Sequence, residues 1–157
     1  MLTIMLTTGA GSAPTPLASF DAALYEAGIG DVNLIALSSV IPEAALLVEK
    51  RPELPLDTWG HRLYVVIAQE TATEPGQQAW AGIGWIRDDT GRGLFVEHHG
   101  GSEDQVRADI GASLDSMRSY RPEHFGPVEM LLRGSECAGV PVTALVSAVY
   151  QSQSWDR

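Results

Sequence analysis

Two adjacent serines, Ser38 and Ser39, are the residues of this sequence best placed to do chemistry. They follow the apolar run 34–37 and precede Val40-Ile41-Pro42, so they stand where a short strand is expected to end. On its own, a serine pair after a strand is typical of a turn or a helix cap, because the hydroxyls bond to nearby backbone groups. A serine hydrolase is not indicated, since the chain has no Gly-x-Ser-x-Gly sequence to present a nucleophile.

A second polar group, Glu97-His98-His99, follows a strand-like run and invites a metal interpretation. Adjacent residues on a strand point to opposite faces, so His98 and His99 cannot easily bind one ion. His61 and His124 are distant in sequence and lack ligand spacing. We therefore predict no metal site.

The serine pair belongs to a longer pattern over residues 9–42. Its distinctive parts hold one register together: Phe20-Asp21, Gly28-Ile29-Gly30, Asn33, Ser38-Ser39 and Pro42. This block resembles the self-cleaving N-terminal region of the pyruvoyl-dependent arginine decarboxylases. The resemblance is dense here and thinner over the rest of the chain. One departure is Glu43, where the family commonly carries a second proline.

The resemblance implies that Ser39 is the precursor of a covalent pyruvoyl cofactor. The Ser39 hydroxyl would attack the Ser38 carbonyl, elimination would leave a dehydroalanine, and hydrolysis would give a ketone and ammonia. The single domain 1–157 would then divide into residues 1–38 and residues 39–157, the latter beginning with pyruvoyl. Asn33 matches the residue whose amide would stabilise the oxyanion of the first step.

The resemblance also implies an enzyme that converts arginine to agmatine and carbon dioxide. The pyruvoyl ketone would form a Schiff base with the substrate amine and withdraw electrons as the carboxylate leaves. Glu97 resembles the family's proton-donor glutamate, and Asp21 its substrate-contacting aspartate, since a carboxylate can accept two parallel hydrogen bonds from a guanidinium. Further substrate contacts are expected from Gly30, Asp31 and Val32.

Composition narrows the classes of protein that remain. The 157 residues, 45% of them apolar, suit one domain with a substantial core. A net charge of −10 argues against a nucleic-acid partner. The opening Met1-Leu2-Thr3-Ile4-Met5-Leu6 is short and lacks Lys and Arg, so neither a signal peptide nor a membrane span is expected. Cys137 is the only cysteine, which suits a cytoplasmic protein.

Periodicity predicts a mixed α/β fold. Helices are expected after Thr15, ending near Gly28, and after Ser102, ending before Pro122. A loop is expected at residues 9–12, and a loop or irregular edge at residues 42–55. Strands are expected at residues 2–8, 31–37, 63–71, 78–86, 93–98, 128–132 and 140–150.

Two helices cannot cover both faces of one large sheet, so two sheets packed face to face are predicted. The resemblance implies the same architecture, a four-layer α-β-β-α sandwich with mostly antiparallel mixed sheets. It further implies trimers, or multiples of trimers, with the active site between subunits. Two alternatives remain open: the same chemistry on another amino acid, and an uncleaved, non-catalytic relative that serves as a binding or regulatory subunit.

Overall fold

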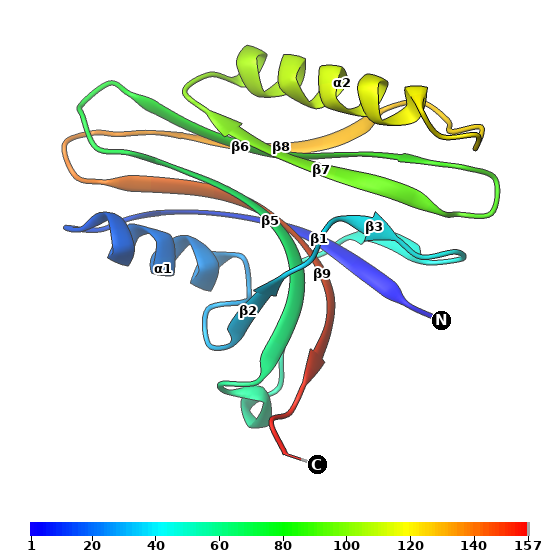
Figure 1. The fold of residues 1–157 in the computed structure, drawn as a ribbon. Helices are drawn as coiled ribbons and strands as arrows, with labels where there is room; N and C mark the ends of the chain where they lie inside the picture. Colours follow the sequence, from blue (N-terminus) through cyan, green and yellow to red (C-terminus); the bar gives the residue numbers. More distant parts are fainter. Residues whose placement is uncertain (157) are drawn as a thin grey trace.

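The chain forms four layers in the order helix, sheet, sheet, helix (Figure 1). In this computed structural model, which describes residues 1–156, the first sheet has the strand order β2-β5-β9-β1-β4 and the second β3-β7-β6-β8. The strands are β1 (Thr3–Ser12), β2 (Asn33–Ala36), β3 (Val40–Ile41), β4 (Leu46–Glu49), β5 (Arg62–Ala72), β6 (Gln78–Arg87), β7 (Gly93–Gly100), β8 (Glu129–Glu136) and β9 (Val142–Gln153). The helices are α1 (Pro16–Glu26), α2 (Glu103–Ser119) and a 3-10 helix, Leu56–Thr58.

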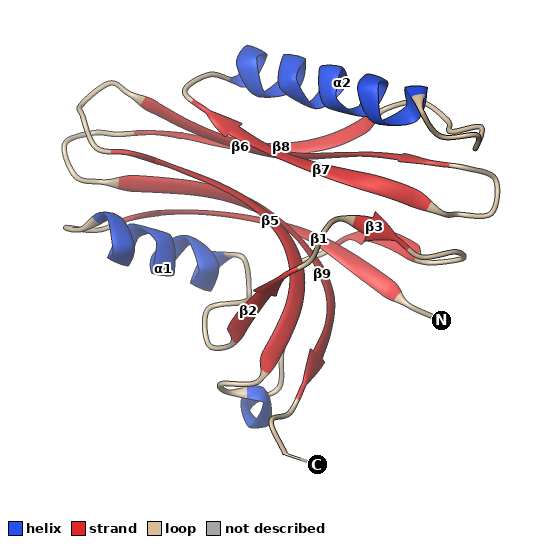
Figure 2. Cartoon of the chain, in the orientation of Figure 1, coloured by secondary structure: helices blue, strands red, loops and turns tan. Residues whose placement is uncertain are grey.

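The predicted sandwich is confirmed. Figure 2 shows the two sheets stacked on each other, with α1 against the outer face of the first and α2 against the outer face of the second. The strand pairs β1–β4 and β2–β5 are parallel, and the other strand pairs in the described residues are antiparallel. Neither α1 nor α2 has the length and apolar character of a bilayer-crossing helix, and the described chain holds no other helix that does.

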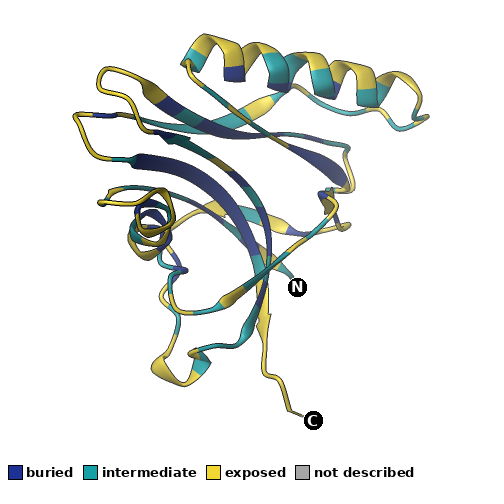
Figure 3. Ribbon diagram, turned by 60° about the vertical axis from the view of Figure 1, so that its left-hand side comes forward, coloured by how far each residue is buried: buried dark blue, intermediate teal, exposed yellow. Residues whose placement is uncertain are grey.

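Apolar clusters fill the spaces between the layers, and buried residues lie along the long strands (Figure 3). The cluster between the sheets includes Ile4, Leu6, Ile41, Val66, Ile83, Phe95 and Val146. The cluster beneath α1 includes Ala23, Leu24, Ile29, Leu63, Val65 and Leu145. The cluster beneath α2 includes Ile86, Val96, Val106, Ile110 and Leu114. Successive strand residues feed opposite clusters, as the two-residue period of a strand requires.

The ends of both helices follow the predicted chemistry. The Thr15 hydroxyl accepts a hydrogen bond from the Ala18 amide at 3.1 Å, and Pro16 follows it, where a missing N–H costs nothing. Gly28 has a φ of 87°, the left-handed conformation that ends many helices. The Ser102 hydroxyl caps α2 through the Gln105 amide at 3.2 Å.

The predicted loop at residues 9–12 is wrong, because β1 continues to Ser12. The reason is close packing between β1 and α1. A Cβ on Gly9 would collide with the Ala23 carbonyl oxygen, and one on Gly11 would lie 2.6 Å from the Ala22 Cβ. These glycines therefore let a helix backbone lie directly on a strand rather than marking a turn.

Residues 42–55, predicted to be a loop or irregular edge, contain a short strand at a sheet edge. Within them, Leu46–Glu49 forms β4, a parallel partner of β1 at the edge of the first sheet. An edge position is compatible with the surrounding prolines, since one side of the strand makes no ladder hydrogen bonds.

The Gly9 packing makes a measurable prediction. Gly9→Ala should lower the free energy of unfolding by roughly 1–3 kcal/mol, because the added methyl group forces α1 away from β1. Urea unfolding followed by circular dichroism measures this change.

Gly111→Ala is the matched control. Gly111 lies in α2 with nothing near its missing Cβ, so alanine there should raise stability by up to about 1 kcal/mol through helix propensity. Equal stability changes in the two variants would contradict the packing argument.

Candidate active site

The serine pair lies where the chain crosses from one sheet to the other. Strand β2 belongs to the first sheet and β3 to the second, and three residues connect them. On the first side, the Leu37 amide donates to the Val65 carbonyl at 2.8 Å. On the second side, the Phe95 amide donates to the Ser39 carbonyl at 2.8 Å. The peptide bond between Ser38 and Ser39 therefore spans the gap between two separately anchored segments.

Ser39 adopts an unusual backbone conformation to make this crossing. Its φ is 76°, in the left-handed region, which costs a non-glycine residue on the order of 1–2 kcal/mol. The residue is only 7% exposed. Its hydroxyl donates a hydrogen bond to Glu97 Oε2 at 2.9 Å. The surrounding contacts thus hold a buried serine in a strained geometry next to a carboxylate.

Strand β7 supplies two of the groups around Ser39. Phe95 and Glu97 are two residues apart on it and share the face that looks toward the first sheet. Phe95 is buried between the sheets, whereas Glu97 is exposed. The same alternation separates the two histidines, because His98 contacts Ser113 of α2 at 2.7 Å and His99 contacts Glu70 of β5 at 3.1 Å.

Tyr150 of β9 completes this group, although no motif or spacing in the sequence pointed to it. Its hydroxyl donates to the Val40 carbonyl at 2.8 Å. Its ring lies edge-on to Phe95, with centroids 6.3 Å apart. Burial, together with the negative charge of Glu97, raises the pKa of Tyr150 to about 12. We call Ser39, Glu97 and Tyr150 the Ser39 cluster.

The expected substrate-contacting residues gather elsewhere in the chain. Gly30, Asp31 and Val32 line a cavity of about 320 Å³ between the C-terminal end of α1 and the 3-10 helix. Tyr25 and Trp59 add aromatic walls to this cavity. We call this cavity the acidic pocket.

The charges around the acidic pocket favour a cation. Asp31 and Glu53 both line it. Arg51 also lines it, but its guanidinium donates to the carbonyls of Tyr25 and Glu26 at 3.0 and 2.8 Å. A cation at the C-terminal end of a helix offsets the negative end of the helix dipole. Arg51 therefore caps α1 and leaves the carboxylates of the pocket to other partners.

Asp21 and Asn33 are not among the residues that line the acidic pocket. Asp21 is exposed on α1, one helical turn before Tyr25 and on the same face. Asn33 begins β2, and its side-chain amide donates to the Gly60 carbonyl at 2.8 Å.

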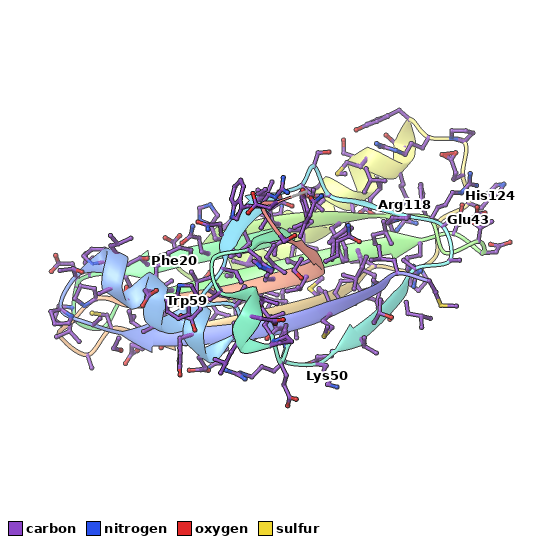
Figure 4. The ribbon with its side chains drawn as sticks, turned by 90° about the horizontal axis from the view of Figure 1, so that it is seen from below. Phe20, Glu43, Lys50, Trp59, Arg118 and His124 are labelled. Carbon is purple, nitrogen blue, oxygen red and sulfur yellow. The ribbon has the colours of Figure 1, made fainter. Side chains whose placement is uncertain are left out.

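Within one chain, Asn33 does not approach the Ser38 carbonyl. The rest of β2 alone adds about 10 Å between them. In Figure 4, Trp59, which lines the acidic pocket, lies well apart from Glu43, which follows Ser39 by four residues. One chain thus carries two groups of candidate site residues, the Ser39 cluster and the acidic pocket, at different places.

The described residues 1–156 contain no group of three His, Cys, Asp or Glu side chains placed to hold a metal ion. The chemistry that the Ser39 cluster offers comes instead from a hydroxyl, a carboxylate and a phenol within one small volume.

Comparison of the sequence with known proteins assigns the chain to a family. The sequence profile of the pyruvoyl-dependent arginine decarboxylases matches residues 3–154. A pyruvoyl-dependent arginine decarboxylase of Thermoplasma volcanium is 38% identical over 136 residues, covering 85% of this chain and 74% of the relative. That of Halobacterium salinarum is 43% identical over 96 residues, and that of Methanocaldococcus jannaschii 37% over 100 residues. These two matches cover 60% and 62% of this chain and 58% of each relative.

The chain therefore belongs to the pyruvoyl-dependent arginine decarboxylase family, whose members carry a covalent pyruvoyl group. The surroundings of position 39 fit that group. The residue is a serine, whose side chain can decay to a plain methyl ketone, and it is buried. The Phe95 amide and the Tyr150 hydroxyl hold the carbonyls of residues 39 and 40, and both contacts lie on the C-terminal side of the Ser38–Ser39 peptide bond.

Proposed function

We propose that this protein is a pyruvoyl-dependent decarboxylase that converts L-arginine to agmatine and carbon dioxide. The observation that carries the proposal is the conformation of Ser39, which is buried, has a φ of 76° and donates a hydrogen bond from its hydroxyl to Glu97. The chain also belongs to a family whose named relatives are arginine decarboxylases. The acidic pocket supports a substrate with a cationic side chain.

The pyruvoyl group arises by cleavage of the chain into residues 1–38 and 39–157. Ser39 Oγ adds to the Ser38 carbonyl carbon, and the amide C–N bond breaks as an ester forms. Loss of the Ser39 Cα proton expels the Ser38 carboxylate, and water then releases ammonia and leaves the ketone. Glu97 orients Oγ by accepting its hydrogen bond. The strain at Ser39 raises the energy of the intact peptide and so favours its rearrangement.

In the cleaved enzyme, the pyruvoyl carbonyl supplies the electrophile for the substrate amine and the electron sink for loss of the carboxylate. Before cleavage Glu97 Oε2 lies 2.9 Å from Ser39 Oγ, so after cleavage this carboxylate is placed to hold a proton beside the pyruvoyl carbon that reacts. Asp21 and Asp31 bind the guanidinium, with backbone contacts from Gly30 and Val32. Asn33 donates its side-chain amide to the oxyanion that forms at residue 38.

A complete site requires two chains. The Ser39 cluster and the acidic pocket lie apart in one chain, and a neighbouring copy can bring its pocket, with Asn33, to the first chain's Ser39. Rings of three copies repeat this contact and close on themselves, so we propose a homotrimer or a multiple of it. The lone Cys137 supports a location in the cytoplasm.

An uncleaved binding subunit is not favoured, because Ser39 and Glu97 are both present and in contact. The acidic character that Asp31 and Glu53 give the pocket argues against the same chemistry on an amino acid with a neutral or anionic side chain.

Cleavage is tested first. The purified wild-type chain should separate on a denaturing gel into pieces of about 4 and 13 kDa at the usual residue mass. Ser39→Ala should leave one intact band, because alanine has no nucleophile, and should release no agmatine from arginine. A wild-type chain that stays intact after long incubation would contradict the proposal.

Glu97→Gln separates the two roles of the carboxylate. Glutamine still offers an oxygen that accepts the Ser39 hydrogen bond, so the chain should still cleave. It cannot deliver a proton, so the agmatine release rate should fall at least 100-fold, the lower range for loss of a positioned acid. A cleaved Glu97→Gln protein with wild-type turnover would refute this assignment.

Mixed oligomers test the shared site. Ser39→Ala and Asp21→Ala chains should each be inactive as homo-oligomers, because one lacks the pyruvoyl precursor and the other a substrate carboxylate. Co-expressed with different affinity tags and purified through both, they should regain a measurable part of wild-type activity. No gain over the separate variants would show that both groups act within one chain.

A further inference from the structure

We propose that Tyr150 is a positioning residue that holds the Ser39–Val40 segment in its reactive conformation. The inference rests on the proposed function, since it concerns the same cleavage and the same pyruvoyl group. Tyr150 lies 110 residues from Val40 in the sequence and on the opposite sheet, yet its hydroxyl bonds to the Val40 carbonyl at 2.8 Å.

The Val40 carbonyl needs this donor because of where β3 lies. Strand β3 is two residues long and forms the edge of the second sheet, and within residues 1–156 it pairs only with β7. Successive carbonyls of a strand point to opposite sides. The Ser39 carbonyl points toward β7 and meets the Phe95 amide, so the Val40 carbonyl points to the open edge. Tyr150 supplies the partner that no strand provides there.

The two hydrogen bonds therefore hold neighbouring carbonyls from opposite sheets. Phe95 holds residue 39 from the second sheet, and Tyr150 holds residue 40 from the first. Val40 itself is 58% exposed, so its side chain contributes little anchoring. Without the phenol, the Val40 carbonyl would lose its partner, and only the short edge strand and the contacts of Ser39 with Phe95 and Glu97 would oppose the tendency of Ser39 to leave its strained φ.

The tyrosine side chain is itself fixed in place. Its ring packs edge-to-face against Phe95, which packs in the same way against Trp85, with centroids 6.3 and 6.1 Å apart. Burial and the negative charge of Glu97 both raise the pKa of Tyr150, so the phenol stays protonated well above neutral pH. The hydroxyl therefore remains a hydrogen-bond donor, and the edge-to-face contacts of its ring fix its position.

The position of the Ser39–Val40 segment affects the cleavage rate, because the attack of Ser39 Oγ on the Ser38 carbonyl is an intramolecular step whose rate depends on how these two groups are aligned. Relaxation of the Ser39–Val40 segment would move Oγ away from that carbonyl and from Glu97. The anchor persists after cleavage, because Val40 remains next to the pyruvoyl group. Tyr150 does not line the acidic pocket, so it should affect turnover more than substrate affinity.

The test compares Tyr150→Phe with Tyr64→Phe. Tyr64 lies on β5 in the same sheet, and its hydroxyl bonds to the Gln153 side chain at 2.7 Å, away from Ser39. Each variant loses one phenolic hydrogen bond and keeps its ring. Newly synthesised chain is followed by intact mass to obtain the cleavage rate, and Tm is measured for each protein. For the fully cleaved fractions, kcat and KM are measured with arginine.

Tyr150→Phe should cleave about tenfold more slowly than wild type, as expected for loss of one hydrogen bond that acts in the transition state. Its kcat should fall with KM nearly unchanged. Tyr64→Phe should match wild type in cleavage rate, kcat and KM, and the two variants should have similar Tm values.

Equal cleavage rates in wild type and Tyr150→Phe would overturn the inference while leaving the proposed function intact. Slower cleavage with a Tm well below that of Tyr64→Phe would also overturn it, because general destabilisation would then explain the loss. A wild-type chain that does not cleave would overturn the proposed function and the inference with it.

Discussion

The hydrogen bond between the Phe95 amide and the Ser39 carbonyl is the contact on which the candidate site depends. It fixes the point at which the chain joins the second sheet, three residues after it leaves the first. So short a crossing is compatible with a positive φ at Ser39, and it directs the Ser39 hydroxyl to Glu97, two residues beyond Phe95 on the same strand face. Strand pairing, rather than a mobile loop, thus creates the strained serine.

The same crossing explains why residues close in sequence serve two different places. Residues 30–33 stay with the first sheet and α1, where they form the acidic pocket and the start of β2. Ser39 belongs to the second sheet, through its contact with β7. A stretch of ten residues therefore contributes to both groups.

Much of the fold could be predicted because its signals are local. Thr15, Pro16 and Gly28 predict the two ends of α1, and the alternation of apolar residues predicts the long strands. The errors came from positions where distant packing decides. Gly9 and Gly11 resemble a turn, but they lie in β1 because α1 packs directly on them. Strand β4 forms because β1 offers it an edge, which no local pattern reveals.

For the site, the sequence by itself determined which groups are available: a serine that can become a ketone, a carboxylate at the end of a strand, and acidic residues after the first helix. The tertiary structure alone decided which of them meet. Glu97 lies 58 residues from Ser39 and Tyr150 lies 110 from Val40, so only strand pairing and sheet stacking could bring them together. The positive φ of Ser39 was likewise hidden, because backbone strain at a non-glycine residue persists only when distant contacts enforce it.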